Sequence, residues 1–125
     1  MKVENKSKIL TGKKGEKIAI EYLKKNGYHI KEINFRCPLG ELDIVAREKK
    51  TIVFVEVKTR YSIKSGYPEQ SVNFRKQRKL SHLAQWYMQK NKITEQSARF
   101  DVVAVTLDKQ CVDIKLIKNA FDFID

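Results

Sequence analysis

Residues 40–60 read GELDIVAREKKTIVFVEVKTR, two runs of apolar, strand-forming residues joined by a short polar connection. The runs at 41–46 and 51–58 predict two β-strands, and residues 47–50 predict the connection between them. The second run is apolar at residues 52–55 and 57, which is typical of a strand covered on both faces. Glu56 and Lys58 interrupt this pattern, so the fold has to account for an acid and an amine on a buried strand.

Glu56 and Lys58 are two positions apart, so their side chains project from the same face of the strand. If the first strand pairs beside the second, Asp43 comes onto that face, and two carboxylates and an ammonium lie close together. Two buried carboxylates repel each other unless a divalent cation lies between them, and oxygen ligands suit Mg²⁺ or Mn²⁺. Such a site predicts phosphodiester hydrolysis, with Lys58 stabilising charge on the phosphate. The spacing alone fits a solvated cross-strand pair equally well, and the apolar flanks favour the site.

The rest of the chain predicts an α/β fold in the order αβββαβ with one extra C-terminal strand. Its 125 residues suffice for one domain, which we expect at residues 12–125 behind a flexible, basic N-terminal tail at residues 1–11. Helical periodicity predicts one helix from Gly12 to a stop at Asn26-Gly27 and a second from Asn73 to Lys90. The other predicted segments are strands at 28–35, 99–107 and 111–117, turns at 37–40 and 108–110, and a loop at 61–71.

The formal net charge of +11 indicates a polyanionic partner, and the excess lies in residues 1–36 and 61–95. Nucleic acid is favoured over an anionic membrane because no basic stretch has the apolar face of an interfacial helix. No run of residues is long and apolar enough to span a bilayer or to serve as a signal sequence, so we expect a cytoplasmic protein. Cys37 and Cys111 stand apart and are expected to be free thiols.

The predicted helix from Asn73 places cations at the end where its dipole favours acids. A backbone phosphate would be held by these cations and the helix N-terminus together, so we expect nucleic acid to contact this helix. Glu16 alone reads as an acid that complements the dipole of the first helix, and His82 and Trp86 are expected to pack or to face solvent. The expected nucleic-acid contacts are Lys13, Lys14, Arg60, Arg75, Lys76, Arg78 and Lys79.

The motifs GELDIVA (40–46) and FVEVKTR (54–60), with Gly15-Glu16, Lys76-Gln77-Arg78 and RFDVV (99–103), resemble the PD-(D/E)xK nuclease superfamily. Within it they are most similar to the small YraN-type family of endonucleases, which is related to archaeal Holliday-junction resolvases. Leu42 stands where the superfamily name has Pro, at a position that shapes the turn.

The resemblance covers nearly the whole chain and implies a restriction-endonuclease-like core, with a mixed central sheet flanked by helices. It implies Asp43 and Glu56 as metal ligands together with the Val57 backbone carbonyl, and Lys58 as the catalytic lysine. It also implies that Glu16 completes the acidic cluster.

The expected function is therefore a Mg²⁺-dependent or Mn²⁺-dependent endonuclease acting on branched or otherwise structured DNA. A homodimer is a further expectation, because resolvases cut two strands symmetrically. The alternatives are a non-catalytic nucleic-acid-binding module that retains the nuclease fold and, less favoured, a protein–protein adaptor that uses it as a scaffold.

Overall fold

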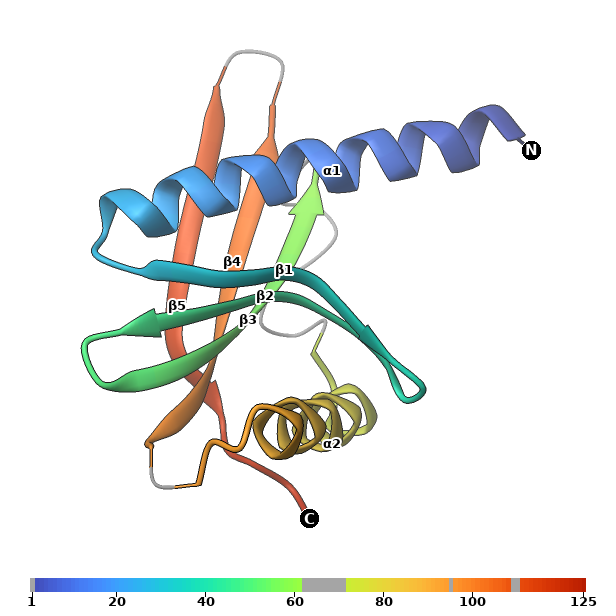
Figure 1. Cartoon of the computed structure of the whole chain (residues 1–125). Coiled ribbons are helices and arrows are strands. Elements are labelled where there is room, and N and C mark those ends of the chain that lie inside the picture. The colour runs from blue at the N-terminus through green and yellow to red at the C-terminus, as the bar shows by residue number, and fades with distance from the viewer. Residues whose placement is uncertain (1, 62–71, 95, 109–110) are drawn as a thin grey trace.

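Strand β3 (Thr51–Arg60) lies at the centre of a five-stranded sheet in the order β1-β2-β3-β4-β5 (Figure 1). The computed structural model describes residues 2–61, 72–94, 96–108 and 111–125, with the backbone alone for residues 2–11. β3 pairs in parallel with β4 (Ala98–Leu107), and the other neighbouring strands pair antiparallel. The element order confirms the predicted αβββαβ core with one extra strand. The remaining elements are α1 (Lys2–Lys25), β1 (His29–Cys37), β2 (Gly40–Glu48), α2 (Phe74–Lys90) and β5 (Val112–Phe121).

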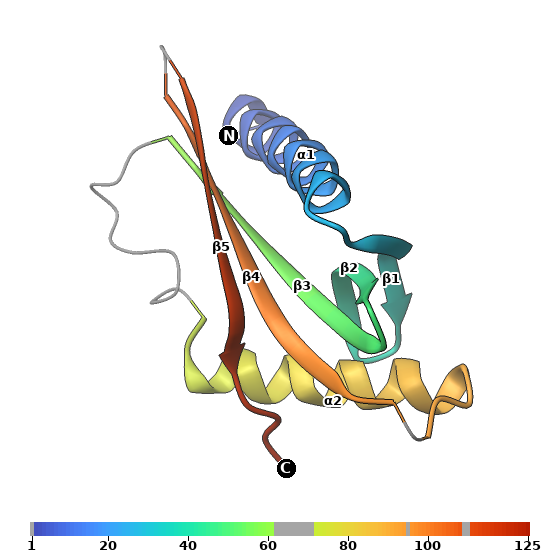
Figure 2. The same cartoon turned by 90° about the vertical axis from the view of Figure 1, so that its left-hand side faces the viewer.

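The two helices cover opposite faces of the sheet, which explains why β3 is apolar on both sides (Figure 2). On one face, Ala19 and Leu23 of α1 pack against β-strand residues that include Val53 and Val55. On the other face, Leu83 and neighbouring residues of α2 pack against a cluster that includes Phe54 of β3. Alternate residues of β3 therefore belong to two separate hydrophobic cores.

Helix α2 agrees with its sequence-based prediction. The Asn73 side chain caps the helix by accepting a hydrogen bond of 2.9 Å from the Lys76 backbone N–H. Its predicted apolar face is buried, and consists of Leu80, Leu83, Ala84 and Tyr87.

Helix α1 begins at Lys2, so the prediction that it begins near Gly12 was wrong. Residues 2–11 contain no Gly or Pro and several strong helix formers, and one glycine costs a helix only about 1 kcal/mol. Figure 1 shows these first turns of α1 extending beyond the sheet. The helix stops as predicted at Gly27, which has a φ of +88°. The division into a flexible tail and a domain at residue 12 stays a prediction.

The strands follow the predicted pattern with longer ends, and β2 and β3 are joined by Lys49 and Lys50 alone. The predicted loop at 61–71 and the turn at 108–110 lie largely outside the described residues. Cys37 and Cys111 are free thiols, as predicted. In the described parts of the chain, no helix has the length and apolar character needed to cross a membrane.

Candidate functional site

The site lies where β2 separates from β3. Their pairing extends from Glu48↔Thr51 only to Ile44↔Val55, whereas β2 remains paired with β1 to the Cys37↔Gly40 end. The β1–β2 hairpin consequently bends away from β3 toward α2 (Figure 1). β3 continues in parallel with β4 to Arg60, so its edge toward β2 is released beyond Val55.

The Asp43 side chain occupies this opening and replaces β2 as a hydrogen-bond partner of the β3 backbone. Its Oδ2 accepts a hydrogen bond of 2.9 Å from the Val57 N–H, which has lost its partner in β2. A residue in a strand directs its N–H and C=O toward the same neighbour. The Val57 carbonyl therefore faces the side on which Asp43 lies, which fits its predicted place among the ligands.

Asp43 and Glu56 are neighbours, as the resemblance implied. Burial and the charge of Glu56, together with a side-chain hydrogen bond to Glu56, raise the pKa of Asp43 to about 8. The Val57 N–H opposes this shift, and the charge of Glu16 adds to it. Glu56 is only 7% exposed. Two carboxylates that lie close together in a partly buried site have a high affinity for a proton, and a divalent cation could replace that proton.

Two lysines neutralise Glu56. The Lys58 Nζ lies 3.3 Å from Glu56 Oε2, so the predicted pair on one face of β3 is present. The Lys76 Nζ from α2 lies 3.3 Å from the same oxygen. Lys76 had been expected at a phosphate, and its approach to Glu56 depends on how α2 crosses the sheet, which local sequence does not specify.

Glu16 approaches from the other face of the sheet, on α1. Burial raises its pKa, its hydrogen bond to Asn34 of β1 lowers it, and the charge of Glu41 raises it. Glu16 contributes to the field at Asp43. Gly15 brings α1 this close to the sheet, because a Cβ on Gly15 would overlap the side chain of Thr59 on β3.

The donor set fits a hard divalent cation in its chemistry, since it consists of carboxylate and carbonyl oxygens. Asp43 and Glu56 are the pair that could hold it, because burial and the charge of Glu56 both disfavour the ionised form of Asp43 and a cation would oppose both effects. Glu16 is further out: in the described part of the chain, no three His, Cys, Asp or Glu side chains come together closely enough to form a metal-binding group.

The expected nucleic-acid contacts do not lie together on one surface. Lys13 and Lys14 are exposed on α1, and Arg60 has its Nε buried with no hydrogen-bond partner among the described residues. Lys76 belongs to the carboxylate site. The other three residues line a groove on the exposed side of α2, and they are Arg75, Arg78 and Lys79.

The amino-acid sequence places the chain in a family of related proteins. Residues 15–105 match the uncharacterised protein family UPF0102, and this range includes Glu16, Asp43, Glu56 and Lys58. The chain belongs to the UPF0102 family. A UPF0102 protein of Caldicellulosiruptor saccharolyticus is 52% identical over 112 residues, covering 88% of this chain and 95% of the relative. One from Acetivibrio thermocellus is 50% identical over 127 residues, covering 96% and 98%, and one from Syntrophus aciditrophicus is 49% identical over 114 residues, covering 91% and 90%.

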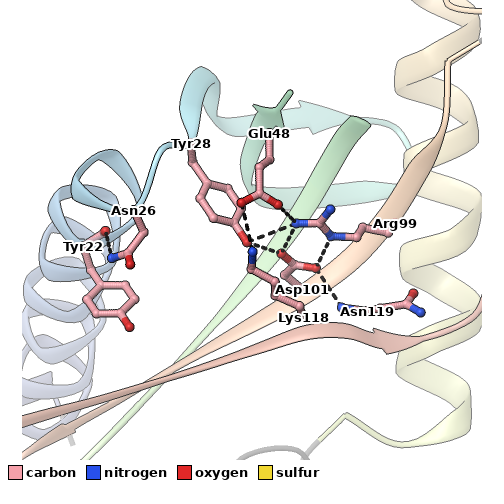
Figure 3. A network of polar contacts seen from close by, with 8 residues as sticks. All are labelled: Tyr22, Asn26, Tyr28, Glu48, Arg99, Asp101, Lys118 and Asn119. Carbon is pink, nitrogen blue, oxygen red and sulfur yellow. Dashed lines mark hydrogen bonds and ion pairs between the residues drawn. The ribbon is translucent and has the colours of Figure 1, made fainter. Parts of the chain in front are cut away.

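This UPF0102 chain also contains a buried ionic network that the sequence did not reveal (Figure 3). Asp101 is fully buried and accepts hydrogen bonds from Arg99 Nε (2.9 Å), Tyr28 Oη (2.7 Å) and the Asn119 N–H (2.9 Å). Arg99 Nη2 also donates to Glu48 Oε1 at 2.6 Å. The sequence signal was an acid inside the apolar run RFDVVAV, although its partners come from distant elements. The network shares a face of β4 with the α1 core, opposite to the face that Glu56 occupies.

Proposed function

We propose that this protein is a metal-dependent endonuclease of the PD-(D/E)xK type, with a restriction-endonuclease-like core, that hydrolyses phosphodiester bonds in branched or otherwise structured DNA. The observation that carries the proposal is the meeting of Asp43 with Glu56 in the opening between β2 and β3, where a cation could take the place of the proton that Asp43 holds. Lys58, on the same strand, supplies the amine that phosphodiester chemistry needs.

Each side chain of the site has a distinct role in this reaction. Asp43 and Glu56 would hold the cation together with the Val57 carbonyl, and the charge of Glu16 would add to the negative potential at Asp43. Lys58 lies at the solvent side of Glu56 with 30% of its side chain exposed, so it can reach a phosphate oxygen and stabilise developing negative charge. When a cation neutralises Glu56, the Lys76 ammonium can leave this carboxylate and bind a phosphate oxygen instead.

A bound Mg²⁺ or Mn²⁺ supplies Lewis-acid polarisation of a phosphoryl oxygen. In the hydrolysis, the oxygen of a water molecule forms a new bond to phosphorus as the water gives up a proton, the bond from phosphorus to the leaving sugar oxygen breaks, and that oxygen takes up a proton, so no net proton is consumed. The protein positions the phosphate between the lysines and the carboxylates, which lowers the entropic part of the barrier.

The test is cleavage of labelled junction, flap, single-stranded and duplex DNA by the purified protein over a range of Mg²⁺ and Mn²⁺ concentrations. We expect metal-dependent cutting of a branched substrate, and a loss of at least about 100-fold in Lys58→Ala and Asp43→Asn. Arg47→Ala is the matched control, because Arg47 is an exposed cation at the opposite end of β2. No cutting of any substrate, or equal cutting by Lys58→Ala, contradicts the proposal.

A second candidate function is a non-catalytic nucleic-acid-binding module. It is favoured by the two lysines that already neutralise Glu56. This function predicts salt-sensitive DNA binding that neither added metal nor Asp43→Asn changes. Calorimetric titration with Mn²⁺ separates the two candidates, because only the nuclease requires heat of binding that Asp43→Asn abolishes.

A further inference from the structure

The exposed side of α2 forms a groove with the turn that joins β1 to β2. The groove has a volume of about 370 Å³, which lies in the range of pockets that hold small organic groups. Its apolar surface comes from Phe74, which is 66% exposed, and from Leu39 in the turn, which is 45% exposed. Cations and an imidazole complete its lining, and they are Arg75, Arg78, Lys79 and His82.

A second groove of about 510 Å³ lies on the other side of the same turn. Trp86 of α2 contributes its aromatic surface and is 40% exposed. Trp86 follows His82 by one helical turn, so the two grooves continue along one side of α2. Phe74 and Trp86 are separated by about 18 Å along the helix axis. The other residues of this groove are Arg36, Cys37, Pro38, Gln89 and Lys90.

The charged side chains that line both grooves are cations, and Arg36 of the second groove forms an ion pair of 2.9 Å with Glu41. Helix α2 contains no Asp or Glu, and its first turn has no acid to complement the dipole. Two exposed aromatic side chains, Phe74 and Trp86, therefore lie among cations on this surface. Alternating aromatic and cationic groups are the pattern that binds stacked bases and their phosphates.

The first of these grooves adjoins the carboxylate site. Lys76 points from the first turn of α2 to Glu56, whereas Arg75 and Arg78 line the groove. Lys79 lies against Gly40, at the start of the strand that carries Asp43. A strand of nucleic acid that follows α2 would therefore reach the carboxylates at the helix N-terminal end.

We propose that the exposed side of α2 binds a single-stranded DNA arm, with unpaired bases stacked on Phe74 and Trp86 and phosphates held by Arg75, Arg78 and Lys79. A base inside a duplex is stacked on both faces by its neighbours and has no free face for these aromatic rings, so the surface discriminates against duplex. This inference rests on the proposed function for its substrate, and it specifies that the cleaved DNA carries a single-stranded arm beside the scissile bond.

Trp86 is the single tryptophan of the chain, so its fluorescence reports directly on this surface. The test is titration of the wild-type protein with an unstructured single-stranded oligonucleotide and with a blunt duplex of the same length, in EDTA. We expect the single strand to quench Trp86 emission and the duplex to leave it nearly unchanged. Quenching by a polyglutamate peptide to the same extent would overturn the proposal in favour of an acidic protein partner.

Variants separate stacking from charge in the same buffer, with affinity followed by the anisotropy of a labelled oligonucleotide. Phe74→Ala and Trp86→Ala are each expected to weaken single-strand binding roughly tenfold, with little effect on duplex. Arg78→Ala is expected to weaken both and to reduce their salt dependence. The controls are Val112→Ala, an exposed apolar residue at the start of β5, and Arg47→Ala. Circular dichroism checks that every variant is folded.

Unchanged single-strand affinity in the folded Phe74→Ala and Trp86→Ala variants overturns this inference. Because EDTA removes any metal, these binding results do not depend on cleavage. A protein that binds single strands as described but cuts nothing retains this inference and loses the nuclease. A protein that cuts branched DNA but shows no effect of these variants retains the nuclease and loses this inference.

Discussion

At the scale of single residues, the candidate site brings acidic and basic side chains together, and local sequence predicts only some of these contacts. The spacing of Glu56 and Lys58 correctly placed both on one face of β3, and their ion pair follows from that geometry. The approach of Asp43 to the Val57 N–H could not be derived in the same way, because it requires the pairing of β2 with β3 to end at Ile44, four residues from the Gly40 end of β2. The pKa of Asp43 should therefore be the property that depends most strongly on this arrangement.

Without metal, the free energy of unfolding of Asp43→Asn should exceed that of the wild type, and the difference should increase as the pH rises. The folded protein retains the Asp43 proton up to about pH 8, whereas the unfolded chain releases it near 3.8. Wild-type stability is therefore greatest below the unfolded pKa and falls until the pH passes the folded pKa. Asn keeps an acceptor for the Val57 N–H and carries no charge. We expect the advantage of Asp43→Asn to grow by about 1–3 kcal/mol between pH 5 and pH 9.

Urea unfolding in EDTA at the two pH values measures this difference, and Mg²⁺ should then stabilise the wild type but not the variant. Glu21→Gln, which neutralises an exposed carboxylate on α1, is the control and should show no such trend. Parallel pH profiles for Asp43→Asn and the wild type would show that Asp43 is not held near Glu56 as described.

At the scale of elements, the first helix and the third strand meet through a close approach at Gly15. The sequence predicted both elements and their apolar faces from periodicity, because burial on a helix or strand repeats locally. It did not predict the start of α1 at Lys2, because Gly12 weakens a helix without ending it. Two glycines of one helix thus have different roles, and a methyl group added to each should have opposite effects.

Gly15→Ala should destabilise the protein and Gly12→Ala should stabilise it. A Cβ on Gly15 would overlap Thr59 of β3, whereas a Cβ on Gly12 would meet nothing within 4 Å. Overpacking costs about 1–3 kcal/mol, and replacing an exposed helical glycine gains up to about 1 kcal/mol. Urea unfolding midpoints of the two variants measure both effects. Because Glu16 follows Gly15, the first variant should also weaken metal-dependent stabilisation, and equal shifts in the same direction would contradict the close packing of α1 on β3.

At the scale of the whole molecule, one buried network joins segments that are far apart in the chain. Asp101 and Arg99 of β4 connect the α1–β1 junction at Tyr28, the end of β2 at Glu48 and the end of β5 at Asn119. Arg99 and Lys118 lower the pKa of Glu48 by donating to its carboxylate. A buried acid inside a strand pattern cannot be interpreted from sequence alone, since its partners are supplied by tertiary structure. The network should therefore contribute to global stability rather than to the chemistry at Glu56.

Asp101→Ala should lower the free energy of unfolding by about 3–5 kcal/mol, because it leaves the Arg99 guanidinium and the Tyr28 hydroxyl without their buried acceptor. This is a large part of the roughly 5–15 kcal/mol that stabilises a typical domain. Asp113→Ala is the matched control: Asp113 is exposed on β5, and its loss should change stability by less than about 0.5 kcal/mol. Urea unfolding measures both variants.

Mn²⁺ calorimetry at low temperature should give the folded Asp101→Ala protein the wild-type affinity, since Asp101 and Glu56 lie on opposite faces of the sheet. An Asp101→Ala protein as stable as Asp113→Ala would contradict this role of the network.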